Sequence, residues 1–308
     1  MKEIIYFDNA ATTPVRPEVY EEMKPYIEKY YGNASSVYAI ARESKKAIDK
    51  AREQVASAIN AKPEEIFFTG CGSESDNWVL KGVANALKDK GNHIITTCIE
   101  HHAILHTCQF LEENGYEVTY LPVDEYGKIS IDDLLNAIRP TTILVSIMFA
   151  NNEIGTIEPI KEIGKICKEK GIYFHTDAVQ AVGHVKIDVQ DMNIDFLSLS
   201  GHKLGAPKGI GALYIRKGCK IKNLIHGGQQ ERGRRAGTEN VIGIVALGKA
   251  IELAVNEMEE TTAKLTYLRD KIIDNVLNNV EYSRLNGHRT DRLPGNVNIS
   301  FEFIEGES

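Results

Sequence analysis

Short apolar runs alternate with longer amphipathic segments along most of this chain, and this alternation constrains the fold more than any other feature. Runs of strand length occupy residues 65–69, 93–97, 117–121, 141–147, 171–176, 195–199 and 210–215. Segments with helical periodicity separate most of them, at residues 35–60, 73–90, 103–114, 131–138 and 160–170. Alternation of this kind predicts an α/β fold, in which helices flank both faces of a mostly parallel sheet.

The C-terminal part of the chain follows a different pattern. Residues 239–280 form one long helical pattern, which predicts either one bent helix or two. A strand pattern at residues 296–301 follows it, and a lone strand cannot bury a core by itself. We therefore expect a large domain over residues 15–256. Residues 1–14 and 257–308 are expected to form an N-terminal segment and an incomplete small α+β domain.

Composition excludes several classes of function. The 308 residues carry a net charge of −7, so neither nucleic acid nor an anionic membrane is an expected partner. The five cysteines are odd in number and form no CxxC pair, so we expect neither a disulfide framework nor a metal site. No run approaches the ~20 apolar residues that span a bilayer, and the N-terminus has no signal-peptide pattern. These features predict a soluble, cytoplasmic protein.

The most informative short motif is SLSGHK, at residues 198–203, which follows a strand pattern. A lysine at the mouth of a parallel sheet can act as a Schiff-base nucleophile, because desolvation and nearby positive charge favour its free amine. Ser200 and His202 can donate hydrogen bonds to a phosphate. The alternative is a surface lysine in a glycine-rich loop, and the polar neighbours and strand context favour the functional interpretation of Lys203.

Asp177 lies 26 residues before Lys203, at the end of another strand pattern. A buried carboxylate against a pyridine nitrogen keeps that ring protonated, and a protonated ring is the electron sink of pyridoxal chemistry. Taken alone, Asp177 would more simply cap a helix. Its pairing with Lys203 favours a pyridoxal-phosphate site.

A glycine-rich turn, TGCGSESDN at residues 69–77, stands between a strand and a helix pattern. Backbone N–H groups at such a turn can bind an anion. Gly70 and Gly72 permit close approach of the backbone, and Ser73 is a natural N-cap and phosphate donor. A dinucleotide-binding turn would need a third glycine where Ser75 stands, so a nucleotide-binding protein is the weaker alternative.

Two further polar groups follow strand patterns. His101, in EHHAI, can stack on an aromatic cofactor and shuttle protons. Asn152, in NNEIG, can bond a phenolic oxygen, although a simple turn explains this motif equally well in isolation. All five motifs lie at predicted carboxyl ends of strands, which is where open α/β sheets bind ligands.

Together these motifs closely resemble the cysteine desulfurases, a family of class V pyridoxal-phosphate enzymes. The matching blocks run in family order from residue 8 to residue 301 and include DNAATTPV, TGCGSESDN, HTDAVQ, SGHK, HGGQQERGRRAGTEN and LPGNVNISF. The resemblance implies the pyridoxal-phosphate-dependent transferase fold type I, which is aspartate-aminotransferase-like. The arginine-rich form of the RGRRAGTEN block is similar to the nitrogenase-associated branch.

The resemblance also implies roles for individual residues. Lys203 would carry pyridoxal 5'-phosphate, and His101 would stack on its ring and transfer protons. Thr238 would reach the phosphate of a neighbouring subunit, so a homodimer with shared sites is expected. The implied cofactor contacts are Gly72, Ser73, His101, Asn152, Asp177, Gln180, Ser200, His202, Lys203 and Thr238. The implied substrate contacts are Asn9, Ala10 and Asn33.

The expected reaction removes sulfur from L-cysteine, giving L-alanine and an enzyme persulfide for an iron–sulfur scaffold or another sulfur-acceptor protein. Selenocysteine lyase and a cofactor-binding but inactive fragment or scaffold subunit are the alternatives. In the family the catalytic cysteine follows the strand that matches residues 296–301, so we expect this chain to lack it. Cys71 is its rival, whereas Cys98, Cys108 and Cys167 are expected to be packed.

Overall fold

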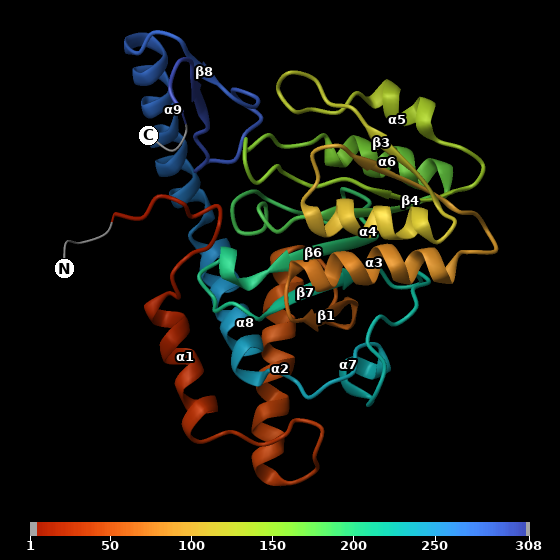
Figure 1. The fold of residues 1–308 in the computed structure, drawn as a ribbon. Helices are drawn as coiled ribbons and strands as arrows, with labels where there is room; N and C mark the ends of the chain where they lie inside the picture. The colour runs from red at the N-terminus through yellow and green to blue at the C-terminus, as the bar shows by residue number, and fades with distance from the viewer. Residues whose placement is uncertain (1–4, 306–308) are drawn as a thin grey trace.

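A computed structural model describes residues 5–305, so residues 1–4 and 306–308 of the two predicted outer ranges lie outside it. Its centre is a seven-stranded sheet with the strand order β1-β7-β6-β5-β4-β2-β3 (Figure 1). The seven strand patterns predicted between residues 65 and 215 all form strands in this sheet. Their bounds are β1 (Ile66–Thr69), β2 (His93–Thr97), β3 (Glu117–Leu121), β4 (Thr142–Ser146), β5 (Tyr173–Asp177), β6 (Phe196–Ser200) and β7 (Gly211–Ile215).

Strand direction decides where the carboxyl ends of these strands lie. Only β7 runs antiparallel, and it does so to both of its neighbours, β1 and β6. The other pairs are parallel. The strands β1 to β6 therefore all end at the same edge of the sheet, which is the edge expected to bind a ligand.

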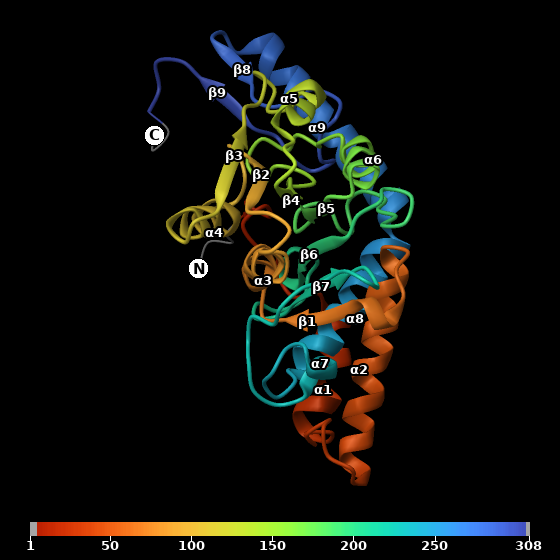
Figure 2. The ribbon, with the colours of Figure 1, turned by 90° about the vertical axis from the view of Figure 1, so that its right-hand side faces the viewer.

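Helices cover both faces of the sheet, which confirms the α/β prediction. One hydrophobic cluster lies under α1, α2, α5, α6 and α8, and a second lies under α3 and α4. Figure 2 shows α3 and α4 on one side of the sheet and α2, α6 and α8 on the other. The bounds are α1 (Pro17–Glu28), α2 (Ala39–Ala58), α3 (Gly72–Ala86), α4 (His102–Glu113), α5 (Ile131–Ala137), α6 (Ile160–Lys170) and α8 (Val241–Asn256).

Two helices near the N-terminus depart from the sequence prediction. The helix α1 was not predicted, although Pro17 stands at its first position, where a missing N–H has no cost. The helix α2 begins at Ala39, four residues later than predicted. Residues 35–38 form a turn and a bend instead, and Ser36 N–H donates to Asn33 O at 3.0 Å.

The C-terminal part is a two-stranded sheet beside a long helix. The helical pattern at residues 239–280 is two helices, α8 and α9 (Met258–Asn279), which meet at Glu257. The expectation of a lone strand is wrong, because β9 (Ile299–Phe301) pairs antiparallel with β8 (Ser283–Leu285). No helix in the described chain combines the length and apolarity needed to cross a membrane.

Candidate active site

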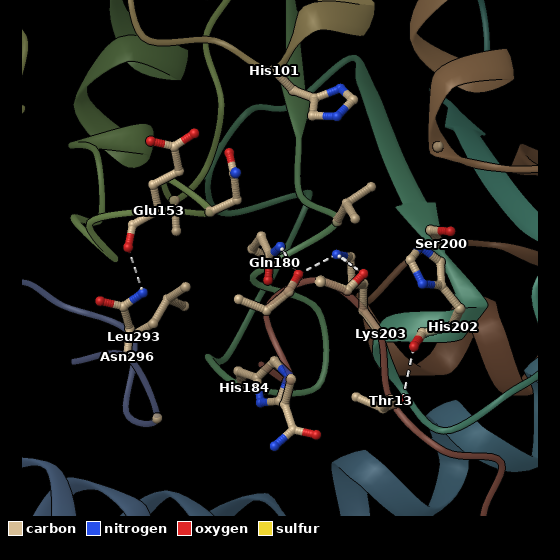
Figure 3. A pocket seen from close by; sticks show the side chains of 18 of the residues that line it. Thr13, His101, Glu153, Gln180, His184, Ser200, His202, Lys203, Leu293 and Asn296 are labelled. Carbon is tan, nitrogen blue, oxygen red and sulfur yellow. Dashed lines mark hydrogen bonds between the residues drawn. The ribbon is translucent and has the colours of Figure 1, made fainter. Parts of the chain in front are cut away.

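A cavity of 940 Å³ opens at the carboxyl edge of the sheet, within the size range of small-molecule sites. Side chains from the ends of several strands meet there, around the lysine singled out in the sequence (Figure 3). The predicted site residues that line the cavity are Asn9, Ala10, Gly72, Ser73, His101, Asn152, Asp177, Gln180, Ser200, His202 and Lys203.

Lys203 reaches the cavity from the short 3-10 turn Gly201–Lys203, which follows β6 directly. Its Nζ donates to Ala10 O and to Ala11 O, the latter at 2.8 Å. Partial burial lowers the pKa of this amine, whereas the carboxylates of Asp8 and Asp177 act in the opposite direction. A lowered pKa increases the fraction of the free amine, which is the nucleophilic form.

Asp177 is the last residue of β5 and is 8% exposed. Its Oδ1 accepts a hydrogen bond from Val179 N–H at 2.9 Å, so the carboxylate does support the following turn, as the simpler alternative required. Burial raises the pKa of Asp177, while the Val179 N–H and the side chains of His101 and Lys203 lower it. The carboxylate is thus a buried acid whose ionised form depends on Lys203 and on its other neighbours at the cavity.

The glycine-rich turn leads into the N-terminus of α3. The helix begins at Gly72, so its N-cap is Cys71, and the expectation that Ser73 is the N-cap is wrong. No side-chain hydrogen bond caps this helix within the described chain, which leaves backbone N–H groups of the first turn for an anion. A Cβ on Gly72 would lie 2.7 Å from Val179 Cγ2, so only glycine fits against this wall of the cavity.

His101 lies at the opposite side of the cavity, where it caps α4 (Figure 3). Its Nδ1 accepts a hydrogen bond from Ala103 N–H at 3.1 Å. Because Nδ1 is an acceptor, the neutral ring carries its proton on Nε2. The ring is exposed, so it can meet a bound molecule from the open side.

Hydrogen bonds join the N-terminal segment to the loop that carries Lys203. Thr13 Oγ1 donates to His202 O at 2.8 Å, and His202 Nδ1 lies 3.1 Å from Thr12 Oγ1. Gln180 Nε2 donates to Ala10 O at 3.0 Å, so this carbonyl accepts from both Gln180 and Lys203. Residues 7–11 and Thr13 therefore line the cavity, Asn9 and Ala10 among them.

A wall of the cavity that sequence reasoning missed comes from residues 293–298. Leu293 N–H donates to Gly155 O at 2.9 Å, and Asn296 Nδ2 donates to Glu153 O at 2.9 Å. These bonds join the segment to the turn that carries Asn152. We call residues 8–11 and 293–298 the rim of the pocket.

Sequence reasoning also missed the surface beneath the cavity. Asp76 lines the cavity from α3, although it is only 1% exposed. His175 and Ser198 lie on the sheet next to it, and both are fully buried. We call Asp76, His175, Asp177 and Ser198 the floor of the pocket. An acid near a helix N-terminus is usually read as a surface residue that favours the helix dipole, so sequence alone gave no signal for Asp76.

Two predicted site residues, Asn33 and Thr238, do not line the cavity of this chain. Both are exposed. The loop that carries Thr238 uses two of its arginines internally: Arg235 pairs with Glu74 at 2.9 Å, and Arg232 donates to Ile66 O at 2.7 Å. Two of the three arginines in this loop therefore have partners within the chain.

The fold and the cavity define a class of protein, an α/β enzyme with a lysine and a buried carboxylate at the carboxyl edge of its sheet, and comparison with known proteins assigns the family. A family model described as aminotransferase class-V matches residues 5–308. A cysteine desulfurase IscS of Methanosarcina thermophila is 64% identical over 304 residues, covering 99% of this chain and 75% of that relative. One of Clostridium botulinum is 62% identical and covers 100% of this chain and 78% of that relative. The chain belongs to the class V aminotransferase family, and within it to the pyridoxal-phosphate-dependent cysteine desulfurases.

Solved structures agree with this assignment. A NifS-like protein superposes with a TM-score of 0.96 at 42% identity, covering 99% of this chain and 84% of that one. A structure described as SspA in complex with cysteine superposes with a TM-score of 0.87 at 43% identity, covering 97% of this chain and 84% of that one. The fold is thus the fold type I predicted from the motifs.

Proposed function

We propose that this chain holds pyridoxal 5'-phosphate on Lys203 and uses it to remove sulfur from L-cysteine, releasing L-alanine. The observation that carries the proposal is the convergence of Lys203, Asp177 and His101, from three different strand ends, on one cavity. The membership in the cysteine desulfurases and the cysteine-bound structural relative support the choice of substrate.

The cavity fits the cofactor at both of its ends. The uncapped N-terminus of α3, with the hydroxyls of Ser73 and Ser200 and the imidazole of His202, would hold the phosphate. Asp177 would face the ring nitrogen. Asn152 and Gln180 would bond the phenolic oxygen. When bound, pyridoxal phosphate supplies an electron sink for the negative charge that develops on the amino-acid carbon.

Each catalytic side chain then has a task that its surroundings support. Lys203 provides the amine that bonds the cofactor, since partial burial lowers its pKa. Asp177 supplies a negative charge that holds a proton on the ring nitrogen. His101 carries an exposed imidazole at the cavity and would transfer protons to and from the substrate. Asn9 and Ala10 would line the substrate-carboxylate side.

The sulfur must pass to a thiolate, and we propose that none of the five cysteines here is that thiolate. Burial raises the pKa of Cys108, Cys167 and Cys219, which disfavours the thiolate. Cys98 is exposed, contrary to the expectation that it is packed, but it does not line the cavity. Cys71 lines the cavity, yet it lies in the turn assigned to the phosphate and away from the substrate.

The test measures alanine and sulfide formed from L-cysteine by the cofactor-loaded chain, beside a version extended to the length of its relatives. We expect turnover by the extended protein and little by the 308-residue chain unless an external thiol such as dithiothreitol accepts the sulfur. Cys71→Ser should leave both values unchanged. Comparable turnover by both lengths, abolished by Cys71→Ser in the shorter one, would make Cys71 the sulfur acceptor.

We also propose that the protein is a homodimer in which Thr238 reaches the partner's phosphate. The support is that Thr238 is exposed and lies outside its own cavity. Mixing Lys203→Ala chains with Thr238→Ala chains tests this. If Thr238 serves the partner, the mixed dimer holds one intact site and regains activity and cofactor; if Thr238 serves its own site, both sites stay defective. Sedimentation that shows only monomer at micromolar concentration, with cofactor bound, contradicts the dimer.

We further propose that a protein accepts the sulfur and that the chain works in a reducing compartment. The resemblance stated from the motifs carries the expectation of a protein acceptor, an iron–sulfur scaffold or another sulfur-acceptor protein. Five free thiols, with Cys71 and Cys98 exposed, fit a reducing compartment such as the cytoplasm. Affinity capture with the cofactor-loaded protein, followed by transfer of labelled sulfur, identifies the acceptor.

A further inference from the structure

The face of the sheet beneath α3 carries polar side chains where apolar ones are expected. Parallel strands buried on both faces normally form continuous hydrophobic runs. Here Ser146 on β4, His175 on β5 and Ser198 on β6 are all fully buried. Ser146 Oγ lies 2.8 Å from His175 Nδ1, and Ser198 Oγ lies 3.0 Å from His175 Nε2. One line of hydrogen bonds therefore crosses three strands.

Asp76 extends this line from the helix layer to the cavity. It is 1% exposed, and its Oδ1 lies 3.7 Å from His175 Nε2. That oxygen has no hydrogen-bond partner in residues 5–305. Buried polar atoms are nearly always paired, so an orphaned carboxyl oxygen at the edge of an active site calls for a function.

The charges around Asp76 decide its protonation. The titratable groups that face it are Asp177, Glu100 and Cys71. Among the described residues no cation faces it, because burial lowers the pKa of His175 to about 3 and keeps that ring neutral. Burial raises the pKa of Asp76 well above its ordinary value, the negative charge of Asp177 raises it further, and a hydrogen bond from Ser198 opposes both.

Asp177 has different charged neighbours, although it lies next to Asp76. The side chains of His101 and Lys203 lower its pKa against the effect of burial. Two close carboxyl groups cannot both ionise without a large repulsion. The first to ionise is therefore Asp177, the one that faces the cations.

We propose that Asp76 is a positioning residue that stays protonated and so confines the negative charge of the floor to Asp177. As a neutral acid, Asp76 can donate a hydrogen bond without adding a second charge beneath the ring nitrogen. The role of Asp177 in this inference rests on the proposed function, whereas the protonation of Asp76 does not.

Infrared spectroscopy of the cofactor-loaded protein at neutral pH tests the protonation directly. A protonated carboxylic acid gives a carbonyl band that a carboxylate lacks. We expect Asp76→Asn to remove one such band, Glu100→Gln to remove another, and Asp177→Asn to remove none. A spectrum in which Asp76→Asn removes no acid band overturns the proposal. The same spectra on protein without cofactor decide the point even if Lys203 bonds no pyridoxal phosphate, which is how failure of the proposed function would show.

Cofactor binding provides a second measurement. It distinguishes a positioning role of Asp76 from a purely structural one. Asparagine mimics a neutral acid, so we expect Asp76→Asn to bind pyridoxal phosphate within about threefold of wild type, with an unchanged pH titration of its absorbance. Asp76→Leu has no donor, and its dissociation constant should rise about tenfold. A titration that moves by more than about one pH unit in Asp76→Asn would mean that a charge was removed and would overturn the proposal. If Asp76→Leu does not fold, the asparagine variant still decides the question.

Discussion

The floor of the pocket is formed by the sheet together with α3, whereas the rim belongs to loops and to residues 8–11. Floor residues are buried, and burial displaces the pKa values of Asp76, His175 and Asp177. Of the four floor residues, Asp76 and Asp177 line the cavity. Rim residues are held by hydrogen bonds between side chains and backbone carbonyls, such as those that Glu153 O and Ala10 O accept. The comparison shows that the buried core sets the protonation of the carboxyl groups of the site. The opening of the pocket and the proposed substrate contacts depend on hydrogen bonds that are individually weak.

Lys203→Ala should have the largest effect, because it removes the only atom proposed to bond the cofactor covalently. We expect loss of the yellow absorbance, of the borohydride-reducible adduct and of all turnover. The measurement is mass spectrometry after borohydride reduction, and Lys208→Ala serves as the matched control because Lys208 does not line the cavity. A reducible adduct that persists on another lysine contradicts the assignment.

His101→Ala should leave the cofactor bound and reduce kcat by about 10²–10⁴-fold, as expected for a positioned acid–base group. The control is His106→Ala, since His106 lies one helical turn further along α4 and stacks on His102 instead. Solvent isotope effects on alanine release would report the lost proton transfer. Full activity of His101→Ala would remove His101 from the mechanism.

Glu100→Gln should change stability with pH in a direction fixed by its burial. Burial raises the pKa of Glu100 to about 8, above its ordinary value near 4.5, so the folded state holds a proton that the unfolded state releases. The stability from this group is complete below about pH 4.5 and is lost as pH rises toward 8. We expect the wild type to lose on the order of a few kcal/mol relative to Glu100→Gln over this range.

Urea unfolding of both proteins at several pH values measures this difference. Glu113→Gln, on the exposed side of α4, is the control and should follow the wild type. A difference between wild type and Glu100→Gln that does not vary with pH would show that Glu100 titrates as an exposed acid. That result would weaken the contrast between a charge-fixing floor and the rim.

Asn296→Ala tests the rim and should have the smallest effect. It removes the hydrogen bond to Glu153 O and an acceptor for Arg292 Nη1 at 3.1 Å. The loss of about 1 kcal/mol should raise KM for cysteine up to about tenfold in the extended protein, with little change in kcat. Asn275→Ala, on an exposed part of α9, should be silent. A drop in kcat as large as that of His101→Ala would show that the rim shares in catalysis.

The sequence predicted those features that depend on local pattern and on the direction of strands. Apolar runs marked every strand of the seven-stranded sheet, and polar residues after the runs marked part of the cavity. The strand β8 was missed because its three residues, Ser283–Leu285, are too few to show an apolar alternation. Only its pairing with β9 identifies it as a strand. The helix α1 was missed because a helix with a proline inside it, Pro25, gives a weak pattern.

The floor escaped prediction for a different reason. Asp76, His175 and Ser198 are polar residues within helix or strand patterns, and only the packing of α3 on β5 and β6 brings them together. Residues 296–298 belonged to a predicted strand, and the place of residues 293–298 in the pocket depends on a contact with Gly155, more than a hundred residues earlier. The domain limits and the roles of all the site residues, Asn33 and Thr238 included, stay predictions.

The hydrogen bonds between the N-terminal segment and the loop that carries Lys203 have a consequence for how this chain folds. Thr13 and His202 are bonded across 189 residues of sequence, and Lys203 bonds Ala11 across 192. Such contacts have a high closure entropy and form late, after local helices and neighbouring strands. On a ribosome, the first residues must wait until the lysine loop has been synthesised. The cavity is therefore completed late in folding. Cofactor uptake can thus report when the native topology is complete.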